Sequence, residues 1–126
     1  MYNNEKLRNI LVAAVAYSIT YIVPVVKLMA GVGILVLIDM VTGVLAARHR
    51  QEEISSKKLR HTVSKGTSYM LAIVASFVVQ RLFLSEIETV KIVSGLIAFI
   101  ELKSIDENFA KITGKSVFKS IIRAKS

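Results

Sequence analysis

One acidic side chain, Asp39, lies near the middle of an apolar run at residues 28–47. A carboxylate at the centre of a membrane helix costs roughly 2.5–3.5 kcal/mol to insert, so such residues pair, hydrogen-bond or carry function. Asp39 is therefore either a neutral, hydrogen-bonded packing residue or a group whose charge or partner changes when the protein changes state. In the second case it would sense membrane energisation or line a water-filled lumen.

Small and polar residues share the helical face that carries Asp39. This face, the Asp39 stripe, comprises Asp39, Thr42, Gly43, Ala46 and Ala47. Small residues let a second helix backbone approach closely, and polar side chains hydrogen-bond across the contact. We therefore expect the stripe to lie at a helix–helix contact rather than toward lipid, and we treat its residues as candidates for helix packing and triggering.

The sequence lacks the patterns of catalytic and cofactor sites. It contains no cysteine, which excludes disulfides, thiolate metal sites and cysteine nucleophiles. His49 and His61 do not form a metal-ligand spacing with the acidic residues, and no hydrolase, metalloprotease, phosphate-loop or dinucleotide-binding motif occurs. We expect no enzyme, no cofactor and no metal.

Four apolar segments must position these residues. They cover about residues 7–26, 28–47, 63–84 and 87–102. About twenty apolar residues suffice to cross a bilayer as a helix. The fourth segment is the weakest, because Glu88, Lys91 and Glu101 dilute it, and only Lys27 separates the first two. We predict one domain over residues 1–126, an all-α membrane protein whose four transmembrane helices form two hairpins, the first of them with a minimal loop.

Basic residues are concentrated outside the apolar segments. Seventeen Lys and Arg against nine Asp and Glu give a net charge of +8. They fall before the first segment, in the loop at 48–65 and in the tail from 103 to 125. Because basic loops stay on the cytoplasmic side, four spans predict an N-in/C-in arrangement. These blocks lack the aromatic or zinc spacing of nucleic-acid modules, so we expect anionic lipid headgroups as partners and no nucleic acid.

The tail, residues 103–126, has the pattern of a basic amphipathic helix. Ile105, Phe109 and Ile112 share one helical face, and a second apolar cluster follows Gly114, with lysines at other positions. A helix of this kind lies in the headgroup plane of a membrane. The alternative is a frayed, solvated tail.

Two serines precede the third apolar segment. Ser55 or Ser56 can accept hydrogen bonds from unpaired backbone N–H groups. We therefore expect one of them to cap a helix that starts near Lys57 and runs into the third segment.

Three short motifs follow one another along the chain. They are the Asp39 stripe; a loop motif of Ser55, Ser56, Lys57, Lys58 and Arg60 followed by Lys65 and Gly66; and an exit motif of Glu101, Ser104 and Asn108 after the fourth segment. In their order and spacing over about residues 8–115, these motifs resemble the bacteriophage holin family related to the toxin-secretion holins of clostridia, sometimes called phage holin family 4.

The resemblance implies a small multi-pass protein of the host bacterial inner membrane that assembles with itself. At a timed point its oligomers open lesions through which an endolysin reaches the cell wall. Two alternatives remain: an antiholin-type lysis regulator, and a small non-lytic membrane transport or scaffold protein. Expression alone separates holin from regulator, because a holin kills the host whereas a regulator delays lysis. Gene neighbourhood separates lysis from transport.

Overall fold

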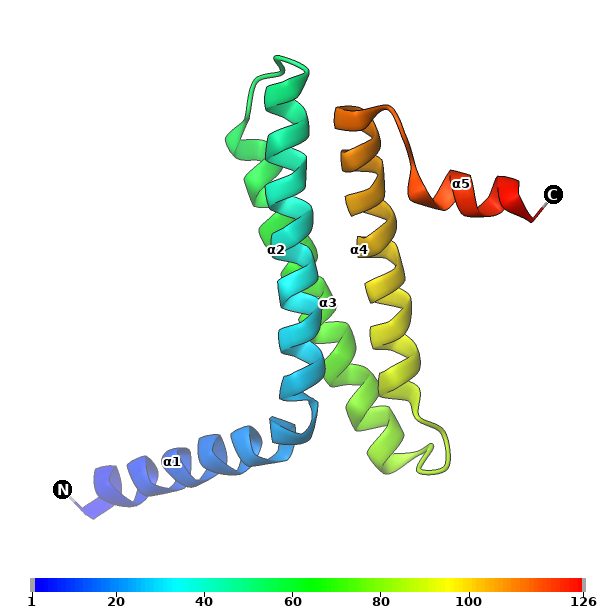
Figure 1. Ribbon diagram of the computed structural model, residues 1–126. Helices are drawn as coiled ribbons and strands as arrows, with labels where there is room; N and C mark the ends of the chain where they lie inside the picture. The colour runs from blue at the N-terminus through cyan, green and yellow to red at the C-terminus, as the bar shows by residue number, and fades with distance from the viewer. Residues whose placement is uncertain (1, 126) are drawn as a thin grey trace.

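Residues 2–125 of the computed structural model fold into five α-helices and one 3-10 turn (Figure 1). The helices are α1 (Tyr2–Ile22), α2 (Val26–His49), α3 (Ser56–Leu82), α4 (Thr89–Thr113) and α5 (Val117–Ala124), and the turn is η1 (Val23–Val25). No strand occurs in the described part of the chain, which confirms the predicted all-α class.

A bundle of α2, α3 and α4 forms the body of the protein. In Figure 1, α2 and α4 run in the same direction and α3 runs opposite to both. We call the end where residues 50–55 join α2 to α3 the loop end, and the end where residues 83–88 join α3 to α4 the turn end. The 24 residues of α2 make a helix about 36 Å long, which exceeds the ~30 Å hydrocarbon core of a bilayer.

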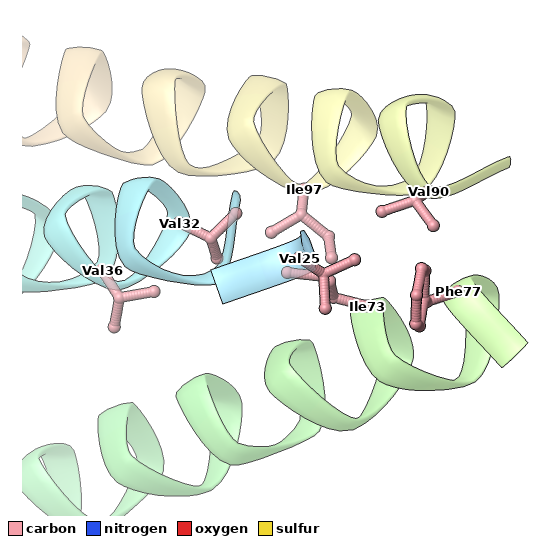
Figure 2. Packing of buried hydrophobic residues seen from close by; sticks show 7 residues of the cluster. All are labelled: Val25, Val32, Val36, Ile73, Phe77, Val90 and Ile97. Atoms are coloured by element: carbon pink, nitrogen blue, oxygen red, sulfur yellow. The ribbon is translucent and has the colours of Figure 1, made fainter. Parts of the chain in front are cut away.

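An apolar core fills the bundle nearer the turn end. Figure 2 shows its seven buried side chains in the space between the three helices. They are Val25, Val32, Val36, Ile73, Phe77, Val90 and Ile97. Large apolar side chains also cover the outside of the bundle, among them Ile34, Leu71 and Leu96, each more than half exposed. An exterior this apolar suits lipid as the surrounding solvent.

Helix α1 does not fold back along α2, so the predicted first hairpin is wrong for this structure. Figure 1 shows α1 pointing away from the bundle. Only its last turn is held, where the ring of Tyr21 lies 5.3 Å from that of Phe77 and the Arg81 guanidinium lies 5.9 Å from the Tyr21 ring. Pro24 is accommodated at the start of η1, where a helix needs no N–H donor. The chain therefore changes direction within the three residues of η1.

Two stretches are long and apolar enough to cross a membrane. They are Asn3–His49, which continues through η1, and Ser56–Leu82. Helix α4 is long enough, but it carries Lys91, Glu101 and Lys103 and is therefore less apolar than these two stretches. The two stretches cover the first two of the four predicted segments and most of the third, so a span at the fourth is not confirmed.

Helix α3 begins at Ser56, seven residues before the predicted span. The Ser55 side chain accepts a hydrogen bond from the backbone N–H of Lys58 at 3.4 Å, and Ser55 is the N-cap residue. This confirms the expected capping role. With this cap the helix includes a polar segment that the hydropathy pattern alone had assigned to the loop.

Helix α4 continues to Thr113, so Ile105, Phe109 and Ile112 belong to α4 and not to a separate tail helix. The sequence predicts a boundary at residue 102 because the hydropathy falls there, and that boundary was wrong. A helix ends where the backbone can leave the helical conformation, and not where the hydropathy falls. Gly114 supplies that end with a φ of 74°.

Only α5 has the amphipathic character expected of the whole tail, and it is eight residues long. Its N-terminus is held by Asp106, which accepts hydrogen bonds from the Ser116 hydroxyl and the Val117 N–H. Phe118 packs edge-on against Phe99 with ring centroids 5.7 Å apart. These contacts direct α5 away from the bundle at the loop end (Figure 1).

Candidate functional site

The Asp39 stripe is buried within the chain, between α2 and the other bundle helices. Asp39 is 9% exposed, Thr42 5% and Ala46 2%. A Cβ atom added at Gly43 would lie 3.5 Å from Nδ2 of Asn108 on α4. The small residues therefore let α2 and α4 approach closely inside one molecule.

Lys65 on α3 lies between two carboxylates from two other helices. Its Nζ is 2.7 Å from Oδ2 of Asp39 on α2 and 3.0 Å from Oε2 of Glu101 on α4. The Lys65 side chain is 20% exposed, and that of Glu101 is 0% exposed. One ammonium group thus connects all three helices of the bundle.

Tyr69 completes the surroundings of Glu101. Its hydroxyl donates a hydrogen bond to Oε1 of Glu101 at 2.9 Å. Lys65 and Tyr69 are one helical turn apart on α3, so both reach the same carboxylate, one at each oxygen. This arrangement gives the fully buried carboxylate a partner at both acceptor atoms.

Asn108 connects α4 to the stripe on α2. Its Nδ2 lies 3.1 Å from Oδ1 of Asp39, 3.2 Å from the Asp39 carbonyl oxygen and 3.1 Å from Oγ1 of Thr42. The Thr42 hydroxyl in turn donates to the Ile38 carbonyl oxygen at 2.9 Å. We call Asp39, Thr42, Lys65, Tyr69, Glu101 and Asn108 together the Lys65 network.

The Lys65 network brings two carboxyl groups to one ammonium. Removing one partner from a buried charge pair strongly destabilises a protein, because the remaining charge is left unpaired. Loss of any one of these three charged side chains would therefore change how α2, α3 and α4 are held together. Among residues 2–125, no group of histidine and acidic side chains is arranged to hold a metal ion. The contacts of the Lys65 network are ion pairs and hydrogen bonds.

A comparison with known protein families identifies the family of this chain. The family model described as the bacteriophage holin family matches residues 13–124, nearly the whole chain. The chain belongs to the bacteriophage holin family. No curated protein and no solved structure is significantly similar to it.

Family membership makes this chain a holin-type membrane protein connected with phage lysis, and the family is not an enzymatic one. It also points to the bacterial inner membrane. The two apolar stretches through α1–α2 and in α3 fit that location.

Some residues of the three sequence motifs come together in the Lys65 network. The structure brings together Asp39 of the stripe, Lys65 of the loop motif, and Glu101 and Asn108 of the exit motif. Gly66 follows Lys65 on α3. A Cβ atom added at Gly66 would lie 3.8 Å from Cγ1 of Val36 on α2.

The other residues of these motifs lie outside the Lys65 network. Lys57 and Arg60 are exposed. Lys58 is exposed and lies 3.8 Å from Glu52. Ser104 is half-buried on α4. The loop motif is therefore split between a half-buried lysine, Lys65, and a solvated basic surface.

Hydropathy gave no sign of the roles of two members of the network. Tyr69 lies within the third apolar segment, and Glu101, although part of the exit motif, counts there as a residue that weakens the fourth segment. On α4, however, the polar residues Ser94, Glu101 and Asn108 recur every seven positions, which places them on one face. All three are buried. That repeat was the available sign that the inward face of α4 carries polar as well as apolar side chains.

Proposed function

We propose that this holin accumulates in the bacterial inner membrane as a four-span N-in/C-in protein, assembles with itself and opens lesions at a timed point. An endolysin then crosses the lesions and reaches the cell wall. The observation that carries this proposal is the family match over residues 13–124.

The surface of α1 supports assembly between copies. Leu11 is 57% exposed, Val15 59% and Ile19 61%, and α1 touches the bundle only near its end. In a membrane, such a helix buries its side chains in lipid or against another helix. For α1 to span, the chain would rotate about η1. We propose that α1 then contacts the bundle of a second copy.

The distribution of charge supports the proposed orientation. The basic α2–α3 connection and the C-terminal end of α4 lie at the same end of the bundle (Figure 1). Basic segments are retained on the cytoplasmic side. The loop end would therefore face the cytoplasm, and the turn end would face outward.

Inducible expression in bacteria tests the lytic function. We expect loss of viability and leakage of a cytoplasmic reporter on induction, and lysis of the culture when an endolysin is co-expressed. The control is Glu101→Lys, which sets a second ammonium beside Lys65 and should abolish killing, with the amount of membrane-inserted protein measured in parallel. Survival of cells that hold the unaltered protein in their membrane would contradict the proposal. Delayed lysis by a second, known holin would instead identify a regulator.

Cysteine labelling tests the orientation, since the chain has no native cysteine. An impermeant maleimide applied to spheroplasts before lysis should label Ser85→Cys in the turn end. It should not label Asn4→Cys or Glu53→Cys. Labelling of Asn4→Cys from outside would show that α1 does not span, and would limit the protein to three spans.

A further inference from the structure

A cavity of about 400 Å³ opens among the loop-end halves of α2, α3 and α4. It reaches from the residues of the α2–α3 connection down to Asp39 and Lys65. Asp39 lies ten residues before the end of α2, so the cavity extends about 15 Å along the bundle. A space of this depth and size is comparable to pockets that hold small organic ligands.

The lining of this cavity is amphipathic. Met40, Val44 and Leu59 contribute apolar side chains, whereas Arg50, Lys58 and Lys111 contribute cations. The cations come from the end of α2, the start of α3 and the end of α4, so they converge from three elements.

Positive charge exceeds negative charge at the mouth of the cavity. Glu52 is the one acidic residue that lines this part, and it lies 3.2 Å from Arg50 and 3.8 Å from Lys58. Lys111 forms no ion pair within residues 2–125. The mouth therefore suits an anion that bridges Lys58 and Lys111, while the apolar wall suits a hydrocarbon chain.

We propose that the cavity binds one anionic phospholipid, with its phosphate group at Lys58 and Lys111 and the upper part of an acyl chain against Met40 and Val44. The inference rests on the membrane placement in the proposed function. Basic pockets between transmembrane helices on the cytoplasmic side are a known form of lipid headgroup recognition. A free phosphate ion would use the cations but would leave the apolar wall in contact with water.

The bound lipid would stabilise the bundle at its loop end. Lys58 is on α3 and Lys111 is on α4, and the apolar core lies nearer the turn end. A phosphate between the two lysines adds a contact between helices where the protein supplies few apolar ones. The lipid thus acts together with the Lys65 network, which closes the inner end of the same cavity.

Lipid binding by the full chain in neutral detergent tests the proposal. Native mass spectrometry would follow titration with phosphatidylglycerol, phosphatidylcholine and inorganic phosphate. We expect one phosphatidylglycerol to bind in preference to phosphatidylcholine, and no displacement by millimolar phosphate. The variant Lys58→Gln/Lys111→Gln should bind about twenty-five-fold more weakly, because each lysine near a headgroup contributes roughly a factor of five.

The matched control is Lys57→Gln/Lys115→Gln, which removes the same charge from exposed positions that do not line the cavity. It should bind as the unaltered chain does. Equal weakening in both variants, equal affinity for the two lipids, or displacement by phosphate would each overturn the proposal. Failure here is separable from failure of the lytic function, because binding is measured on purified protein and killing is measured in cells.

Discussion

Lys65 and Glu101 form an ion pair between α3 and α4 with Nζ 3.0 Å from Oε2, and the Glu101 side chain is 0% exposed. The same ammonium lies 2.7 Å from Asp39 on α2. In the loop-end half of the bundle the polar groups of this network face inward, while apolar side chains fill the core nearer the turn end and cover the outside, which suits a lipid environment. Lys65 is the one group in the network that contacts both carboxylates, and its removal should have the largest effect.

Replacing Lys65 with methionine should destabilise the folded bundle by about 3 kcal/mol, because two buried carboxyl groups lose their shared partner. The measurement is unfolding in mixed micelles by a denaturing detergent. Lys57→Met is the control, since Lys57 is exposed and outside the network. Equal stability of the two variants would show that the pairing contributes nothing to the fold.

Asp39→Asn should leave insertion and folding intact and make lysis start earlier. The amide oxygen still accepts from Asn108, but the amide NH2 group then faces the Lys65 ammonium, which keeps only Glu101, so the expected loss is about 1–3 kcal/mol. A weaker network should release the helices sooner. Lysis onset is measured at matched expression, with Glu107→Gln, an exposed acid on α4, as the control. Unchanged timing would mean that Asp39 serves packing alone.

Gly43→Leu should separate α2 from α4 and destabilise the monomer by about 2 kcal/mol, since overpacked side chains force the backbone to shift. Gly43→Ala should be tolerated, because its Cβ meets Asn108 at 3.5 Å, an ordinary contact. Thermal unfolding in detergent measures both. Gly31→Leu is the control, because nothing lies within 4 Å of the Cβ position of Gly31. A stable Gly43→Leu chain would show that the helices need not approach so closely.

The attachment of α5 should depend on pH. The Ser116 hydroxyl and the Val117 N–H donate hydrogen bonds to Asp106, beyond the apolar part of α4, and hold the pKa of that carboxyl below its ordinary value. A lowered pKa favours the attached form above the ordinary carboxyl pKa, near 4, and that stabilisation is lost as the pH falls toward the lowered pKa. A spin label on Ser120→Cys should therefore become more mobile under acid conditions.

Asp106→Ala should give the mobile spectrum already at neutral pH, whereas Glu107→Ala should not. A label whose mobility is the same in all three chains would show that these hydrogen bonds do not hold α5.

The local features of this protein follow from the order of its residues. Apolar runs separated by basic segments indicate membrane helices. Ser55 before the third segment indicates a helix start, and the structure confirms that cap. These features depend on neighbours a few positions apart, so they can be predicted without a tertiary structure.

The contacts across the bundle were decided only by the tertiary structure. Asp39, Lys65 and Glu101 are 26 and 36 positions apart, and a hydropathy average treats each of them as a defect in an apolar segment. In the folded bundle these three charged side chains form ion pairs with one another, because a buried charge is stable only beside an opposite one. The direction of α1 was also undetermined by the sequence. Pro24 permits a bend, but where α1 points depends on its contacts with the bundle, which are confined to its last turn.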